Sequence, residues 1–130
     1  MNYIKQFIDI RIEDVPEVGG KNASLGEMYS SLTSKGVKVP NGYAITAEAF
    51  RYYLTYNGLD EKIAGYLKGL DPENLEQLAD VGGKIRASIA HGEMPEDLEQ
   101  QIKDAYAGMG EEYGHNPDVA VRSSATAEDL

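Results

Sequence analysis

The sequence predicts a helix-rich α+β fold, and three observations lead to this prediction. Apolar residues recur at helical spacing in several separate stretches. Short apolar runs that are suited to strands are few and scattered along the chain. The chain has 130 residues, of which 42% are hydrophobic and 26% are charged, enough for one domain with a core. We therefore expect several helices and only a small sheet.

The first elements are a short strand and a helix. Residues 3–8 are apolar and β-prone, and they predict a short edge strand. Residues 10–18 are acidic, and we expect them to be irregular because Pro16 breaks a helix. Helical spacing of apolar residues then predicts a helix from Lys21 to about Ser34, which Gly36 ends.

A second strand and a second helix follow. Residues 43–45 predict a short strand, and Thr46 can cap a helix that extends to Asn57 and ends at Gly58. Three apolar residues of this helix are expected to form its buried stripe: Phe50, Tyr53 and Leu54.

The second half of the chain predicts three more helices. The first begins at Asp60, the second begins at Asp71-Pro72-Glu73, and the third begins at Pro95. The apolar stripes expected on these three helices are Ile63, Ala64 and Leu67; then Leu75, Leu78, Ile85 and Ile89; then Leu98, Ile102, Ala105, Tyr106 and Met109.

The last segment alternates like a strand. Residues 118–122 predict a strand, and the residues after it are small, polar and acidic. The chain stops just after this predicted junction of strand and loop, where functional residues often lie. We therefore expect the chain to be a piece of a longer protein.

Charge and composition exclude several classes of function. The chain has 12 Lys and Arg residues against 22 Asp and Glu residues, which gives a net charge of −10. This charge argues against binding to nucleic acid or to acidic membrane surfaces. There is no cysteine, no apolar run long enough to span a membrane, and no signal-peptide pattern at the N-terminus. We expect a soluble cytoplasmic protein, and the sequence predicts no particular oligomeric state.

The stretch Val18–Met28 contains the first candidate site, Gly19-Gly20-Lys21, at the start of a predicted helix. A helix start offers unpaired backbone N–H groups, and lysine adds a positive charge, so a phosphate is a suitable ligand. The alternative is a Gly-Gly turn before a helix with a solvated lysine. A P-loop is excluded because Val15 and Asn22 stand where that motif needs glycine and Ser or Thr.

The same four residues recur as Val81-Gly82-Gly83-Lys84. This second copy lies inside a predicted helix, where each glycine costs about 1 kcal/mol, and we interpret it as purely structural. It also shows that Gly-Gly-Lys alone is weak evidence for a site.

Arg122 is the second candidate, because an arginine at a strand end can bind phosphate oxygens with two hydrogen bonds. The alternative is an ordinary exposed arginine before a polar tail. His91 and His115 lie in turn-like contexts and are predicted to be surface residues. The paired acids Glu111-Glu112 and Glu128-Asp129 are also interpreted as solvated, and no metal site is predicted.

Three segments together resemble a known family. Val18–Met28, Val39–Phe50 and Ala120–Leu130 are similar, in this order, to the N-terminal part of the phosphoenolpyruvate synthase and pyruvate, phosphate dikinase family. Rifampicin phosphotransferase belongs to the same family. The residues Asn22-Ala23-Ser24 and Arg122-Ser123-Ser124-Ala125 resemble the synthase branch more than the phosphate-using dikinase.

The resemblance implies that residues 1–130 are the N-terminal part of an ATP-grasp nucleotide-binding domain. Lys21 and Arg122 would then contact the ATP phosphates, and Thr126 would lie near them. In the family, ATP phosphorylates a histidine of another domain, which passes the phosphoryl group to pyruvate in a third domain. His91 and His115 do not match that histidine's motif. The Mg²⁺ ligands, the phosphohistidine and the pyruvate domain are expected outside this chain, so we expect the isolated chain to be inactive.

Three other interpretations remain open from the sequence. The chain can belong to a pyruvate, phosphate dikinase or to a rifampicin phosphotransferase instead of a synthase. It can also be a free-standing helical interaction module without catalytic function.

Overall fold

A two-stranded antiparallel sheet joins the N-terminal residues to the middle of the chain. In the computed structural model, which describes residues 1–127, strand β1 (Ile4–Gln6) pairs with strand β2 (Tyr43–Ile45), and Lys5 lies opposite Ala44. Both strands were predicted. Because side chains alternate along a strand, Ile4 and Lys5 face opposite sides of the sheet.

One side of the sheet carries the apolar core, which packs against helix α2 (Gly20–Thr33). Ile10 is fully buried there, and Gly26 of α2 lies directly against it. The buried members of this core are Phe7, Ile10, Val18, Ala23 and Ala44. The helix-rich α+β fold is therefore confirmed, with the core in the N-terminal part of the chain.

Three short helices connect β1 to α2: the first takes the last two residues of the strand predicted at 3–8, and the other two lie where an irregular segment was predicted. They are η1 (Phe7–Asp9), η2 (Ile12–Asp14) and α1 (Val15–Val18). The prediction that Pro16 breaks any helix is wrong, because Pro16 lies in the first turn of α1. A first-turn residue has no intrahelical N–H bond to lose, so proline is tolerated there.

Local signals set the ends of α2 and α3 (Ala47–Tyr56) as predicted. Gly36 has a φ of +83° just after α2, a conformation that favours glycine. The Thr46 hydroxyl accepts a hydrogen bond of 3.2 Å from the Ala49 backbone N–H and so caps α3. The predicted burial of Phe50 is wrong, because this side chain is 49% exposed.

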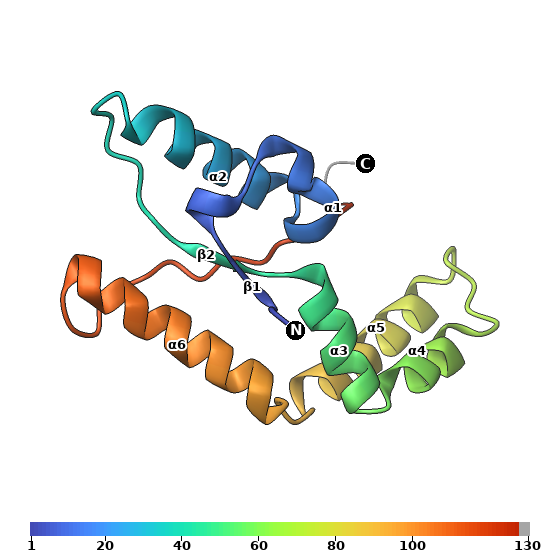
Figure 1. The fold of residues 1–130 in the computed structure, drawn as a ribbon. Coiled ribbons are helices and arrows are strands. Elements are labelled where there is room, and N and C mark those ends of the chain that lie inside the picture. Colours follow the sequence, from blue (N-terminus) through green and yellow to red (C-terminus); the bar gives the residue numbers. More distant parts are fainter. Residues whose placement is uncertain (128–130) are drawn as a thin grey trace. The chain divides into compact units, whose positions relative to one another are not determined.

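Helix α6 (Glu96–Tyr113) lies on the other side of the sheet from α2 (Figure 1). Leu98 and Ala105 are buried, as predicted. Polar contacts also attach α6. The Gln101 side chain accepts a hydrogen bond of 2.7 Å from the Tyr3 backbone N–H and donates one of 2.9 Å to the Met1 carbonyl oxygen.

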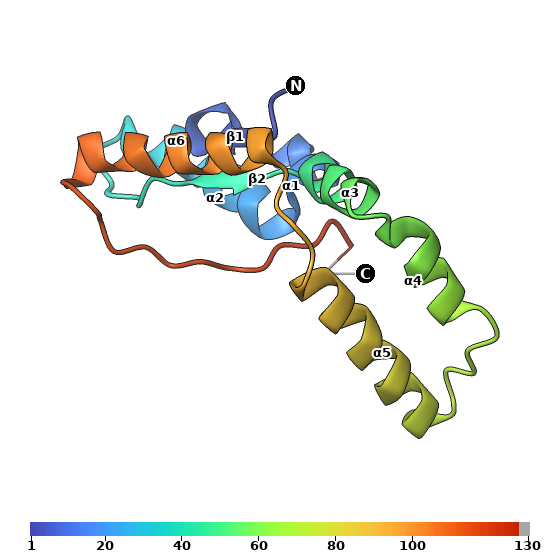
Figure 2. The same ribbon diagram turned by 90° about the horizontal axis from the view of Figure 1, so that it is seen from below.

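The predicted strand at residues 118–122 is wrong. This part of the chain has no strand pairing in the described structure, and Val121 is 91% exposed. The segment after α6 runs apart from the sheet and reaches the end of α1 at Ser124 (Figure 2). Alternating residues favour a strand only where a neighbouring strand supplies hydrogen bonds, and the segment follows a path without one.

Residues Arg51–Pro95 form a second compact unit, while Met1–Phe50 and the chain from Glu96 onward form the first. Helices α4 (Leu59–Leu67) and α5 (Leu75–Ala90) pack together in the second unit. Leu75 is 76% exposed and Leu78 is 42% exposed, so the predicted stripe of α5 is not buried at its start.

Two further predictions concern α5: the residue that caps its start and the second Gly-Gly-Lys sequence in its middle. Asn74, and not Asp71, caps the helix, because its side chain accepts a hydrogen bond of 3.1 Å from the Gln77 backbone N–H. Gly82-Gly83-Lys84 lies inside α5, as predicted, and Lys84 pairs with Asp80 one turn earlier. Among residues 1–127, no helix is both long and apolar enough to cross a lipid bilayer.

The contact of Gly26 with Ile10 gives a stability prediction. A Cβ at position 26 would overlap the Ile10 side chain and lie 2.9 Å from its carbonyl oxygen. We expect Gly26→Ala to destabilise the chain by about 1–2 kcal/mol, after the gain in helix propensity is subtracted. Gly65→Ala in α4 is the control, because its Cβ would meet nothing within 4 Å. Chemical denaturation measures both variants, and equal stabilities would contradict the packing argument.

Candidate phosphate-binding site

The turn between α1 and α2 consists of a single residue, Gly19. Its φ of +84° and ψ of 160° lie in a region that only glycine adopts without strain. The Gly19 N–H donates a hydrogen bond of 2.8 Å to the Val15 carbonyl oxygen, which ends α1. The Gly19 carbonyl oxygen accepts one of 3.0 Å from the Ala23 N–H, which begins α2. One glycine therefore sets the direction in which α2 begins.

The structure places the segment that follows Arg122 directly against this turn. The Ser124 hydroxyl donates a hydrogen bond of 2.6 Å to the Val18 carbonyl oxygen, across 106 positions of sequence. A Cβ on Gly19 would overlap the Ser124 Oγ and would lie 2.9 Å from the Ala125 carbonyl oxygen. The absence of a side chain at Gly19 thus allows the two segments to meet.

The Val18 carbonyl oxygen also accepts a second hydrogen bond, of 2.9 Å, from the Asn22 side-chain amide. A carbonyl oxygen has two lone pairs, and here each has a donor. The Val18 side chain is 3% exposed and belongs to the apolar core. Val18 therefore links the core, the start of α2 and the Ser124 segment.

The three predicted contact residues lie on the two segments that meet. Lys21 is the second residue of α2 and is exposed. Arg122 lies two residues before Ser124, Thr126 lies two residues after it, and both are exposed. The first backbone N–H groups of an α-helix point out of its N-terminal end rather than to acceptors within the helix, and α2 begins here. The segments offer backbone donors and cationic side chains, which is the chemistry that binds a phosphate group.

An ion-pair cluster holds α1 to the sheet. The Lys5 ammonium of β1 lies 3.0 Å from Glu17 Oε2 and 3.3 Å from Asp14 Oδ2. The hydrogen bond to Glu17 raises the pKa of Lys5, although burial works in the other direction. The hydrogen bond of 2.8 Å from the Arg11 backbone N–H lowers the pKa of Asp14, and Lys5 lowers it further. Lys5 is therefore a charge neutralised by its neighbours rather than a phosphate ligand.

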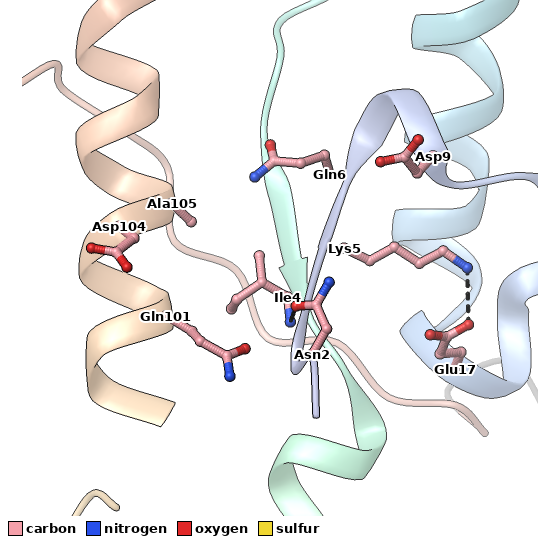
Figure 3. A pocket seen from close by; sticks show the side chains of 9 residues that line it. All are labelled: Asn2, Ile4, Lys5, Gln6, Asp9, Glu17, Gln101, Asp104 and Ala105. Carbon is pink, nitrogen blue, oxygen red and sulfur yellow. Dashed lines mark hydrogen bonds and ion pairs between the residues drawn. The ribbon is translucent and has the colours of Figure 1, made fainter. Parts of the chain in front are cut away.

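A hollow of about 580 Å³ lies between β1 and α6, apart from the predicted contact residues (Figure 3). Its lining includes Lys5, Glu17, Gln101 and Asp104. Figure 3 shows the Lys5 side chain directed toward Glu17 and away from α6. With this charge paired and further acids around it, the hollow does not suit an anionic ligand, so we do not assign the phosphate site to it.

The remaining candidates take no part in this arrangement. His91 and His115 are exposed, as predicted, and His91 Nδ1 lies 2.7 Å from the Ala87 carbonyl oxygen at the end of α5. The Glu112 carboxylate accepts a hydrogen bond of 2.7 Å from the Asn41 side chain. Within residues 1–127 no group of three His, Asp or Glu side chains could hold a metal ion. Glu128 and Asp129 lie outside the described residues.

Sequence reasoning did not identify the residues that join the two segments. Asn22, Ser124 and Gly19 were given no role in joining the two segments, although each lies within a motif that was singled out. Serine and asparagine often bond to nearby backbone, which is a weak local signal. The partner carbonyl of Ser124 is too distant in sequence to be predicted from spacing.

Comparison with known proteins defines the family. The family model described as "Pyruvate phosphate dikinase, AMP/ATP-binding domain" matches residues 15–130, and the chain belongs to this family. The chain is also similar to proteins named phosphoenolpyruvate synthase, so the resemblance predicted from the three motifs is confirmed.

Two of these relatives are 52% identical to the chain. The phosphoenolpyruvate synthase of Neisseria meningitidis matches over 130 residues, which are 99% of this chain and 16% of the relative. That of Aquifex aeolicus matches over 123 residues, 94% of this chain and 14% of the relative. A protein named probable phosphoenolpyruvate synthase, from Methanocaldococcus jannaschii, is 43% identical over 131 residues. The chain therefore spans less than a fifth of the length of these relatives.

The contact at Gly19 is tested by comparison with another glycine of similar φ. We expect Gly19→Ala to separate Ser124 from Val18 and to destabilise the chain more than Gly36→Ala. Both positions have a φ near +84°, but a Cβ at Gly36 meets nothing within 4 Å. Each substitution strains a backbone of positive φ, and at Gly19, whose ψ of 160° lies in a region nearly confined to glycine, this strain adds about 1–3 kcal/mol to the overlap. Denaturation gives the difference between them, and the idea fails if Gly36→Ala is the more damaging change.

The Lys5 cluster predicts a loss of stability in acid. Because the pKa of Asp14 is lowered from 3.8 in the folded chain, its stabilising contribution is present above that value and is lost as the pH falls through the folded pKa. We expect Asp14→Asn to cost about 1 kcal/mol at pH 7, and this cost to shrink below about pH 4. The Lys5 and Asp14 side chains are 23% and 24% exposed, so solvent screens the pair only in part.

The control for Asp14→Asn is Asp80→Asn, which removes an exposed pair with Lys84. An exposed pair contributes less than about 0.5 kcal/mol, so this variant is expected to have little effect at either pH. Urea denaturation at pH 7 and pH 3 provides the comparison. A cost of Asp14→Asn that is the same at both pH values would show that its charge is not responsible.

Proposed function

We propose that the chain contributes ATP-phosphate contacts to a nucleotide-binding domain of the ATP-grasp type, of which it forms the N-terminal part. Lys21 and Arg122 are the proposed contacts, with Thr126 near the phosphates. The observation that carries the proposal is the hydrogen bond from Ser124 to Val18, which brings the two motifs together. The family's AMP/ATP-binding description supports the ligand.

The proposed contacts suit a polyphosphate on physical grounds. The start of α2 supplies N–H donors and the positive end of the helix dipole. Lys21 adds a compact charge, and the Arg122 guanidinium can bind two phosphate oxygens at once. Phosphoryl transfer depends mainly on positioning and on neutralising charge, so these groups are sufficient for this part of the task.

We further propose that the parent protein is a phosphotransferase of the phosphoenolpyruvate synthase kind. It would convert ATP, pyruvate and water to AMP, phosphoenolpyruvate and phosphate, in the cytoplasm. The names of the relatives support this assignment over the dikinase and rifampicin branches. The phosphohistidine and the pyruvate site would lie outside this chain. When bound with ATP, Mg²⁺ neutralises phosphate charge, and we place none of its protein ligands in residues 1–127.

The contacts are tested in a full-length synthase in which this chain replaces the matched segment of the Neisseria meningitidis relative. We expect Lys21→Ala and Arg122→Ala each to lower ATP-dependent phosphorylation at least about 100-fold, because each removes a charged contact from the phosphates. Radiolabelled ATP measures the transfer. Lys84→Ala is the matched control, since it alters the second Gly-Gly-Lys, inside α5.

Wild-type phosphorylation in both site variants would refute the assignment of Lys21 and Arg122. Circular dichroism shows whether each variant keeps its helices, which separates a loss of contact from a loss of fold. We also expect the 130-residue chain alone to transfer no phosphoryl group and to bind Mg-ATP only weakly, because the rest of the proposed site lies outside it. Calorimetry that found micromolar binding to the chain alone would contradict this part of the proposal.

A further inference from the structure

We propose that Ser124 is a positioning residue that aligns Arg122 with the start of α2, so that the two motifs act on a ligand as one unit. This inference rests on the proposed function and adds a residue to it. The Ser124 hydroxyl does not itself need to touch the ligand. It donates its hydrogen to the Val18 carbonyl oxygen at 2.6 Å and is engaged there.

The segment that carries Arg122 is exposed along its described length. Residues 118–127 are exposed and belong to no helix or strand. The hydrogen bond from Ser124 ties this segment to the turn before α2. Upstream, the Tyr106 hydroxyl donates to the Pro117 carbonyl oxygen at 2.8 Å. The place of Arg122 is therefore set between an anchor at Pro117 and an anchor at Ser124.

The anchor at Ser124 attaches to a rigid point. Val18 is buried in the core, and its carbonyl oxygen also accepts the Asn22 side chain of α2. Gly19 fits against Ser124 and Ala125 only because it lacks a Cβ. The hydroxyl thus binds to the same carbonyl group that orders the first turn of α2, the turn that contains Lys21.

The short separation along the chain relates the anchor at Ser124 to the position of Arg122. Two residues of chain span at most about 7 Å, so the backbone of Arg122 lies within that distance of Ser124. A hydroxyl that holds Ser124 on the turn therefore keeps Arg122 close to the start of α2. Without it, the exposed segment would sample many positions, and a ligand would have to order it on binding.

The test is a double-mutant cycle on ATP affinity in the full-length synthase that carries this chain. We expect Ser124→Ala to weaken ATP binding about three- to tenfold, as the loss of one neutral hydrogen bond implies. In the Arg122→Ala background, where there is no arginine to align, Ser124→Ala is expected to have no further effect. The ATP titrations extend to millimolar concentrations, so that the ATP affinities of the weaker variants can still be measured.

Two further variants separate positioning from general stability. Ser124→Thr keeps the hydroxyl and is expected to restore most of the affinity. Ser88→Ala is the matched control, because the Ser88 hydroxyl donates a comparable hydrogen bond of 2.9 Å to the Lys84 carbonyl oxygen. This control is expected to leave ATP affinity unchanged.

A measurement without ATP tests the hydrogen bond itself. In the 130-residue chain, the ¹³C resonance of the Val18 carbonyl is expected to shift in Ser124→Ala and to return in Ser124→Thr. The inference is overturned if Ser124→Ala binds ATP as tightly as wild type, or if it weakens binding equally with and without Arg122. If Lys21→Ala and Arg122→Ala leave ATP affinity unchanged, it is the proposed function that fails.

Discussion

The backbone at Gly19 is the constraint on which the rest of the candidate site depends. Its φ of +84° allows α1 to end and α2 to begin within one residue. The missing Cβ leaves the space that the Ser124 hydroxyl and the Ala125 carbonyl occupy. Any other residue at position 19 would strain the backbone, because φ is positive, and its Cβ would also overlap the second segment. A short turn thereby becomes a meeting point for distant parts of the chain.

The apolar core fixes the residue that precedes this turn, Val18. Val18 buries its side chain with Phe7 and Ile10, while its carbonyl oxygen accepts hydrogen bonds from Asn22 and Ser124. The same residue thus joins the apolar packing to the polar arrangement at the surface. A second helix glycine, Gly26, allows α2 to approach Ile10 closely. Gly19 and Gly26 therefore have packing roles, and the charge that suits a ligand comes from Lys21.

The sequence predicted those features that depend on near neighbours. The limits of α2, the strand at residues 43–45 and the Thr46 cap follow from local signals, and the structure confirms them. The prediction for residues 118–122 was wrong because a strand also requires a partner, which alternation does not reveal. Lys21 and Arg122 were chosen for their chemistry and their motifs. Their neighbourhood could not be predicted, because it depends on a hydrogen bond across 106 positions.

The net charge of −10 bears on how an anion could bind to such a chain. Charges beyond about 8 Å are largely screened at physiological ionic strength, so the local surroundings outweigh the total. The nearby ammonium of Lys5 is already paired with Asp14 and Glu17 and offers little to an incoming phosphate. Attraction must then come from groups that two segments bring together at the turn. An acidic domain can thus bind a polyanion where an arginine is positioned beside a helix start. For this reason the position of Arg122 relative to α2 matters as much as its charge.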